Sequence, residues 1–206
     1  VTPGELLLID SGGQYIDGTT DITRTVAIGA PGDDERACFT RVLQGMIAIS
    51  RARWPKGLAG RDLDALARAP LWMAGMDYAH GTGHGVGVYL NVHEGPQRLA
   101  RISEVPLEPG MILSNEPGYY REGAFGIRIE NLIVVREAAK IGDNRDQLDF
   151  QTLTYVPIYL SLVDTTMLAP GARAWLNAYH AETLEKIAPR VSEGALQWLK
   201  GATRAI

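Results

Sequence analysis

The chain has 206 residues, 46% hydrophobic and 21% charged, which is ordinary for a soluble globular protein. Its formal net charge of -4 provides no basic surface and argues against a nucleic-acid partner. No apolar run approaches the roughly 20 residues of a membrane span. The single cysteine, Cys38, excludes an internal disulfide and fits a reducing compartment such as the cytoplasm. We expect Cys38 to lie on a helix face as a small apolar residue.

The start of the chain is unusual. It opens at Val1 with neither an initiator methionine nor a signal-peptide pattern, and it enters an apolar strand over residues 5–9 almost at once. Natural chains seldom begin one turn before a core strand. We therefore expect this sequence to be a fragment whose upstream part is missing.

The first third of the chain predicts two strands followed by two helices. In chain order these are a buried strand over residues 5–9, a β-branched strand over 22–28, a helix from 33 to about 54, and a helix over 62–69. Ser11-Gly12-Gly13 should break the first strand, and Asp17-Gly18 is a turn signal before the second. Pro70 should end or kink the second helix.

The remainder predicts further strands and a helical C-terminal part. We expect strands over residues 111–114, 126–135 and 153–159, and helices over 172–187 and 192–199. The segment 80–88 is dense in glycine, which lets a backbone approach a ligand or another strand closely. His180 has no chemical context and should lie on a solvated helix face.

Five residues with metal-binding side chains fall near strand ends or in the glycine-rich segment. Asp10 should end one strand and Asp21 should begin the next, while Glu116 follows the third strand. Glu130 lies within the fourth, where a carboxylate is costly to bury without a partner. His84 lies among the glycines.

Each of the five also has an ordinary structural explanation. Asp10 and Asp21 suit turns or caps, Glu116 suits a loop, and His84 could be a hydrogen-bonded loop histidine. Glu130 could pair with Arg128 or Arg136 on a solvated face. A functional role therefore depends on the set and not on any single residue.

Several segments resemble, in order and spacing, the signature blocks of aminopeptidase P. This is the Xaa-Pro aminopeptidase branch of the pita-bread metallopeptidases, family M24. The segments are LIDSG (8–12), GTTDITRT (18–25), HGTGHGVG (80–87), NVHEGP (91–96), SNEPG (114–118) and GIRIEN (126–131). The ordered set is far more specific than any one motif.

The resemblance implies an α+β fold of the pita-bread type, lacking its N-terminal portion. Residues 1–150 would form the C-terminal part of the catalytic domain. Residues 151–206 would be a C-terminal extension that packs on it. Three segments, DGTT (17–20), NVHEGP (91–96) and the tail over residues 153–162, look like the long, three-domain type of aminopeptidase P. The C-terminal part of that type usually forms a homodimer, so a homodimer is a candidate assembly.

The resemblance also implies a centre of two divalent metal ions, with manganese the first choice and zinc or cobalt as alternatives. Asp10 would hold one ion, His84 and Glu116 the other, and Asp21 and Glu130 would bridge. Four carboxylates and one imidazole suit such ions, which at roughly 3.5–4 Å apart convert a bridging water to hydroxide near neutral pH. Asp17 competes for a ligand role but is assigned to the turn.

Three further residues receive catalytic roles from the resemblance. His93 would contact the peptide and steady the tetrahedral intermediate or pass a proton, since the pKa of histidine lies near the operating pH. His80 would line the substrate cleft. Arg128, two positions before Glu130, would share its strand face and orient a carboxylate or a substrate group.

The implied activity is that of a metal-dependent exopeptidase that releases the residue before proline by attack of metal-bound hydroxide. Its substrates would be peptides with proline at the second position. Two alternatives remain open: a prolidase that acts on Xaa-Pro dipeptides, and a non-catalytic pita-bread module that binds proteins. Since one wall of the cleft could be absent, we expect the isolated chain to bind metal weakly and to hydrolyse peptides poorly.

Overall fold

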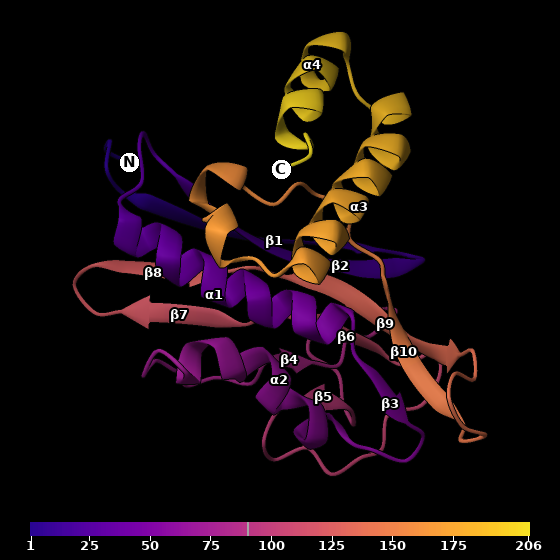
Figure 1. Ribbon diagram of the computed structural model, residues 1–206. Helices are drawn as coiled ribbons and strands as arrows, with labels where there is room; N and C mark the ends of the chain where they lie inside the picture. Colours follow the sequence, from indigo (N-terminus) through magenta and orange to yellow (C-terminus); the bar gives the residue numbers. More distant parts are fainter. Residues whose placement is uncertain (90) are drawn as a thin grey trace.

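The computed structural model describes residues 1–89 and 91–206. This part of the chain has an α+β architecture of short antiparallel sheets and four α-helices (Figure 1). The strands are β1 (Leu6–Tyr15), β2 (Gly18–Ala27), β3 (Arg53–Pro55), β4 (Gly83–His84), β5 (Arg98–Leu99), β6 (Ile112–Asn115), β7 (Gly118–Arg121), β8 (Phe125–Arg128), β9 (Asn131–Ala138) and β10 (Gln147–Thr152). The α-helices are α1 (Asp33–Ser50), α2 (Gly60–Trp72), α3 (Pro170–Ile187) and α4 (Glu193–Ala202), and the 3-10 helices are η1 (Leu160–Leu162), η2 (Thr165–Met167) and η3 (Ala188–Arg190).

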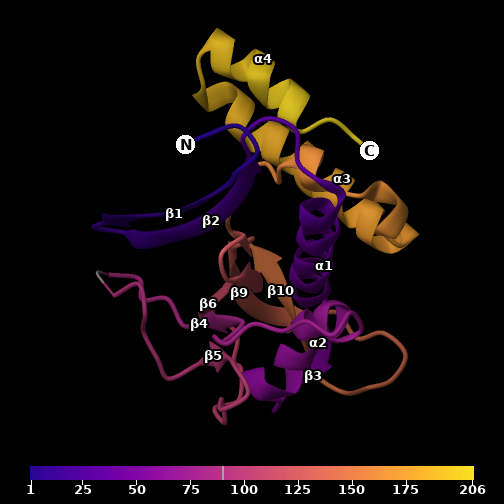
Figure 2. The same cartoon turned by 90° about the vertical axis from the view of Figure 1, so that its left-hand side faces the viewer.

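The first two strands form one long hairpin that extends away from the helices (Figure 2). The predicted break at Ser11-Gly12-Gly13 is wrong, because β1 continues through these residues to Tyr15. Gly12 lies opposite Asp21, and a Cβ on Gly12 would be 2.8 Å from the Thr20 carbonyl oxygen of β2. Gly12 therefore permits a close pairing of the strands. Asp10 consequently lies in the middle of β1, and β2 begins at Gly18 and not at residue 22.

The strand predicted over residues 126–135 is two strands, β8 and β9, with Ile129 and Glu130 between them. The backbone N–H of Glu130 donates to the Thr23 carbonyl of β2, at 3.0 Å, and that of Ile129 donates to the Pro117 carbonyl, at 3.3 Å. These long-range hydrogen bonds replace the pairing of a continuous ladder. Glu130 therefore lies at a break between strands, where its side chain faces the hairpin.

A four-stranded antiparallel sheet, in the order β3-β10-β9-β6, lies behind α1. The predicted helix over residues 33–54 ends at Ser50, and residues 53–55 pair with β10 instead. The strand predicted over 153–159 is absent from the described residues, since β10 ends at Thr152. The carbonyls of Val156 and Pro157 accept hydrogen bonds from a side chain, and Pro157 has no N–H to donate to a ladder.

Helix α1 contributes to both hydrophobic clusters of the core. Phe39, Leu43 and Ile47 pack in a cluster that includes Ile127 and Ile129 and reaches Leu176 of α3. The C-terminal Ile49 of α1 belongs to a second cluster, formed with α2, β3, β6, β9 and β10. Cys38 is fully buried in the first cluster, which confirms its prediction as a small apolar residue on a helix face.

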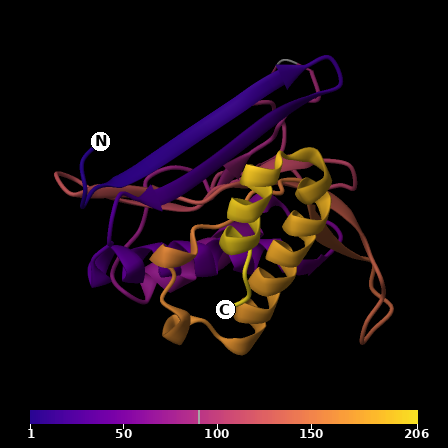
Figure 3. The same cartoon turned by 90° about the horizontal axis from the view of Figure 1, so that it is seen from above.

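Helix α2 and the C-terminal helices refine two predictions. Helix α2 continues two residues beyond Pro70, because a proline this close to the end costs only the hydrogen bonding of the last turn. Helices α3 and α4 confirm the predicted helical C-terminal part and lie side by side (Figure 3). In the part of the chain described above, no helix has both the length and the apolar composition needed to cross a membrane.

The prediction for His180 is wrong, because this residue is buried in α3 and does not lie on a solvated face. Its Nε2 accepts a hydrogen bond of 3.0 Å from the backbone N–H of Ile158. Burial, with an additional contribution from the charges of Arg24 and Arg204, lowers the pKa of His180 to about 4. The neutral imidazole therefore joins α3 to the segment that follows β10.

This burial should make stability depend on pH. A histidine that is neutral in the fold and protonates near pH 6.5 when unfolded contributes fully above pH 6.5, and this contribution is lost progressively as the pH falls from 6.5 towards 4. When the pH falls from 7.5 to 5, we expect the free energy of unfolding to decrease by about 2 kcal/mol, because His180 takes up a proton only in the unfolded chain. His180→Gln retains an acceptor for Ile158 but does not titrate. Urea denaturation at both pH values should show a smaller loss in this variant; equal losses would contradict the assignment.

Candidate metal centre

Two of the predicted ligands lie on one face of the β1–β2 hairpin. Asp10 lies directly opposite Thr23, and Asp21 is two residues before Thr23 on the same strand. Residues that face each other across an antiparallel pair, and residues two apart on a strand, point to the same side. Asp10, Asp21 and Thr23 therefore project together, towards the break between β8 and β9.

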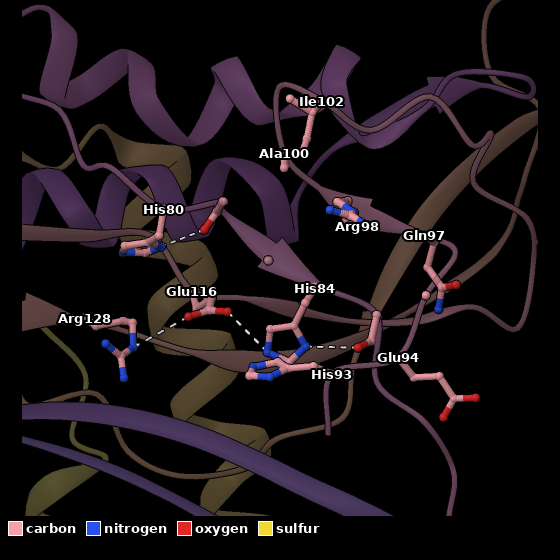
Figure 4. A pocket seen from close by; sticks show the side chains of 14 residues that line it. His80, His84, His93, Glu94, Gln97, Arg98, Ala100, Ile102, Glu116 and Arg128 are labelled. Carbon is pink, nitrogen blue, oxygen red and sulfur yellow. Dashed lines mark hydrogen bonds and ion pairs between the residues drawn. The ribbon is translucent and has the colours of Figure 1, made fainter. Parts of the chain in front are cut away.

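Four predicted ligands meet at this point. Ligand atoms of Asp21, His84 and Glu130 all lie within 4.8 Å of one another. The Nε2 atom of His84 is 3.4 Å from Oδ2 of Asp21 and 3.3 Å from Oε1 of Glu116. Figure 4 shows the Glu116 carboxylate between the His84 ring and Arg128. The sequence segments that carry these groups are widely separated, so only the tertiary fold assembles them.

Glu130 is the most deeply buried carboxylate of this group, with 2% of its surface exposed. Its Oε2 accepts a hydrogen bond of 2.6 Å from the Thr23 hydroxyl, while its Oε1 has no hydrogen-bond partner among the described residues. Burial and the nearby carboxylates of Glu116, Asp21 and Asp10 raise the pKa of Glu130 to about 8. The alternative in which Glu130 pairs with an arginine on a solvated face is therefore wrong.

The imidazole of His84 has one nitrogen fixed and one directed at the carboxylates. Its Nδ1 is 3.0 Å from the carbonyl oxygen of Gly85, which accepts a hydrogen bond and so leaves Nε2 as the nitrogen with a lone pair. Burial alone would lower the pKa of His84, but contacts with Asp21 and the Gly85 carbonyl, and the charge of Glu116, raise it. This arrangement is typical of a metal-binding histidine.

Ser114 joins two of the predicted ligands. Its hydroxyl donates to Oε1 of Glu116 at 3.0 Å and accepts from the backbone N–H of His84 at 2.9 Å. Gly83 makes this approach possible, because a Cβ there would lie 1.9 Å from the Ser114 carbonyl oxygen. No sequence pattern pointed to Ser114 beyond its place in the SNEPG segment.

Asp10 and Arg128 form the outer part of the site. Asp10 lies outside the three-residue group, and its side chain is 52% exposed, yet its Oδ2 is 2.5 Å from Nη2 of Arg128. The same guanidinium donates to the Thr23 hydroxyl at 3.0 Å and lies 3.6 Å from Glu116. Arg128 therefore contacts two of the predicted ligands, Asp10 and Glu116. Arg128 ends β8 and Glu130 lies in the break before β9, so the two residues do not belong to one continuous strand.

A cleft of about 530 Å³ opens onto these residues. His80, His93 and Arg128, the three predicted catalytic residues, all line it, together with His84 and Glu116. The ring of His93 is exposed and meets the His84 ring edge-on, with 4.1 Å between centroids. The geometry thus brings all three to one cavity, while their chemical roles stay predictions.

Tyr120 contacts two of the residues that line this cleft, and the sequence prediction missed it. Its hydroxyl is 2.9 Å from Nε2 of His80 and 3.1 Å from Nη1 of Arg128. The Nδ1 of His80 is 2.7 Å from the Gly81 carbonyl, so the Tyr120 hydroxyl donates to Nε2. Burial lowers the pKa of His80 and raises that of Tyr120. The only available signal was its place after Pro117-Gly118, which does not distinguish it from Tyr119.

A buried ion pair beneath the cleft positions the glycine-rich segment. Arg68 of α2 donates to Asp64 at 2.6 Å and to the His80 carbonyl at 2.7 Å, and both side chains are almost fully buried. Asp64 also accepts from the Thr82 hydroxyl at 2.7 Å. The pair therefore attaches α2 to the segment that carries His80 and His84.

The donor set fits divalent metal ions. Three carboxylates and an imidazole converge, a fourth carboxylate lies at the rim, and one buried oxygen of Glu130 has no protein partner in the described part of the chain. Gathering like charges is unfavourable unless cations balance them. Hard oxygen donors with one imidazole suit manganese and similar ions more than a structural zinc site rich in cysteine.

Comparison with protein families identifies the chain. The model of metallopeptidase family M24 matches residues 1–137, and the model of the C-terminal region of peptidase M24 matches residues 146–206. The chain belongs to metallopeptidase family M24. This confirms the family to which the resemblance pointed.

Curated members of the M24 family resemble the chain along its whole length. It is 53% identical to aminopeptidase P2 from Arabidopsis thaliana, covering 100% of this chain and 30% of that protein. It is 51% identical to a probable Xaa-Pro aminopeptidase P from Tuber melanosporum, covering 100% of this chain and 34% of that protein. The chain thus spans about a third of the length of these relatives.

Solved structures of the M24 family confirm the predicted pita-bread fold. An X-prolyl aminopeptidase from Caenorhabditis elegans, described as a cytosolic enzyme with a di-nuclear active site, matches with a TM-score of 0.92 and 43% identity over 98% of this chain and 33% of that one. A prolidase from Pyrococcus furiosus matches with a TM-score of 0.64 and 31% identity over 76% of this chain and 43% of that one.

The buried ion pair should be more important for stability than a surface pair. Asp64→Asn leaves the Arg68 guanidinium buried without its main counter-charge, and we expect a loss of about 3–5 kcal/mol of unfolding free energy. The matched variant Asp149→Asn removes the partner of the exposed Arg136 and should cost at most about 1 kcal/mol. Chemical denaturation of both variants measures the difference. Similar losses would contradict a special role for the buried pair.

Metal binding should depend on Asp21 and not on the neighbouring turn carboxylate. Asp21→Asn removes one charge from the converging group, and we expect the affinity for Mn²⁺ to fall more than about tenfold. Asp17→Asn removes the same charge from the exposed hairpin turn and should change the affinity less than about twofold. Isothermal titration calorimetry of the two variants provides the comparison. Equal affinities would argue against a metal centre at this position.

Proposed function

We propose that this chain carries the catalytic centre of a metal-dependent exopeptidase that releases the N-terminal residue preceding proline. The observation that supports it most is the convergence of Asp21, His84, Glu116 and Glu130 at a cleft that His80 and His93 also line. The resemblance to an X-prolyl aminopeptidase with a di-nuclear active site agrees with this proposal. A hydrolase of this kind would act on peptides with proline at the second position, in a reducing compartment such as the cytoplasm.

The residues proposed to hold two divalent ions are Asp10, Asp21, His84, Glu116 and Glu130, with manganese the preferred ion. Bound ions of this type supply Lewis acidity and lower the pKa of water, so that a nucleophile is available near neutral pH. Two atoms are best prepared for such a role: Oε1 of Glu130, which has no hydrogen-bond partner within residues 1–89 and 91–206, and the acceptor Nε2 of His84. Zinc and cobalt remain alternatives.

The remaining residues of the cleft would bind and orient the peptide. His93 is exposed beside His84, where its ring can donate to the scissile carbonyl or move a proton to the departing amine. His80, held by Gly81 and Tyr120, would form part of the wall against which the proline ring packs. Arg128 would keep Asp10 and Glu116 in position through its two contacts.

The long type of aminopeptidase P is favoured over prolidase by the C-terminal part of the chain. Residues 146–206 match a C-terminal region model of the family, and the match to the X-prolyl aminopeptidase covers 98% of the chain, against 76% for the prolidase from Pyrococcus furiosus. We place the boundary of this extension near residue 150. We also propose a homodimer formed through residues 151–206.

Hydrolysis should require metal and a proline at the second position. We expect the Mn²⁺-loaded chain to release arginine from Arg-Pro-Pro slowly, as predicted for a chain that spans a third of its relatives, and removal of metal with EDTA to abolish release until Mn²⁺ is restored. The matched peptide Arg-Ala-Ala should be cleaved at least about tenfold more slowly. Chromatography of the products measures all three. Faster cleavage of the dipeptide Arg-Pro than of Arg-Pro-Pro would indicate a prolidase, and metal-independent cleavage would overturn the proposal.

A further inference from the structure

Arg24, three residues after Asp21, is a buried cation that the proposed function does not use. Only 8% of its surface is exposed, and its guanidinium forms no ion pair with any carboxylate in residues 1–89 and 91–206. Its hydrogen bonds go to neutral acceptors instead. Burying such a charge costs hydration free energy, so the hydrogen bonds of the guanidinium must offset that cost.

The guanidinium holds the backbone on both sides of the metal centre. Its Nη1 donates to the Thr23 carbonyl at 2.9 Å and also to the Glu130 carbonyl, and its Nη2 donates to Oδ1 of Asn131 at 2.7 Å. Thr23 and Glu130 are the residues whose side chains share the 2.6 Å hydrogen bond inside the centre. Arg24 therefore connects the two backbone segments that determine where the Glu130 carboxylate lies.

The same guanidinium reaches the C-terminal part of the chain. It donates to the carbonyls of Val156, at 2.7 Å, and Pro157, at 3.1 Å, and to the hydroxyl of Tyr179 on α3, at 3.0 Å. The break between β8 and β9 leaves the Glu130 carbonyl outside any ladder, so Arg24 supplies the donor that a neighbouring strand would otherwise provide. One side chain thus attaches α3 and the segment after β10 to the metal-ligand strand break.

We propose that Arg24 is a positioning residue of the metal centre, which fixes the Glu130 carboxylate by holding the backbone carbonyls of Thr23 and Glu130 and which couples the centre to α3 through Tyr179. This inference rests on the proposed function. Because arginine offers five donors in a fixed planar geometry, lysine cannot replace it at a site that uses six separate acceptors. The residues beyond 150 would then contribute to metal binding without contacting the metal.

Metal titration of the 206-residue chain tests this proposal, with Mn²⁺ as the probe. We expect Arg24→Gln and Arg24→Lys to bind Mn²⁺ at least about tenfold more weakly than the unchanged chain, as is usual for residues that orient metal ligands. The electron paramagnetic resonance signal of coupled Mn²⁺ pairs should decrease in the same variants. Arg136→Gln, which removes an exposed guanidinium from β9, is the matched control and should change neither reading.

Thermal unfolding of the metal-free variants distinguishes a loss of metal-ligand positioning from a loss of fold stability. The Mn²⁺ titrations are made well below the unfolding temperature of each variant. A lower unfolding temperature with unchanged Mn²⁺ affinity would overturn the proposal. If the Arg24 variants do not fold, Tyr179→Phe decides. It removes the hydroxyl, with its hydrogen bonds to the Arg24 guanidinium and to the backbone of Thr154 and Val156, but keeps the ring that stacks on Trp175. A twofold to threefold loss of affinity supports the coupling, and no loss overturns it. Absence of Mn²⁺ binding by the unchanged chain would instead overturn the proposed metal centre itself.

Discussion

Mutual repulsion among buried carboxylates is the constraint around which this fold is organised. Glu130, Glu116 and Asp21 approach one another beneath a cleft, and burial together with the neighbouring charges raises the pKa of Glu130 to about 8. Such an arrangement is stable only when cations or directed donors balance it. His84, Thr23, Ser114 and Arg128 each supply part of that balance, and one oxygen of Glu130 has no hydrogen-bond partner in the part of the chain that the structure describes.

The surrounding elements can be understood as supports for that group. The hairpin presents Asp10 and Asp21 on one face, the buried pair of Asp64 and Arg68 attaches α2 to the glycine-rich segment, and Arg24 attaches α3 to the strand break. Helix α1 contributes to both hydrophobic clusters and so fixes these supports relative to one another. Rigid support of this kind lets a metal centre hold its geometry when ions bind.

Local sequence patterns predicted the four α-helices and the strands β1, β2 and β6, but not the strands β3, β4, β5, β7 and β10. They also failed where distant groups compete for the backbone. The predicted strand over 126–135 divides because the backbone N–H of Glu130 donates to the carbonyl of Thr23, a residue 107 positions earlier. The predicted strand over 153–159 is lost because the Arg24 guanidinium donates to the carbonyls of Val156 and Pro157. The misplacement of His180 has the same origin, since nothing in the helix pattern reveals that Ile158 will donate to it. Tyr120 and Ser114 were missed because their relevance depends on partners far away in the sequence.

The sequence by itself determined the α+β class, the M24 family and the types of side chain at the centre, because ordered blocks of residues preserve the chemistry that a site needs. Tertiary structure decided that Glu130 lies at a break between strands, that Asp10 stays at the rim with Arg128, and that the guanidinium of Arg24 joins three segments. The physical reason is that local propensity determines helices and hairpins. The hydrogen-bond partners of buried polar groups depend instead on which distant segments pack beside them.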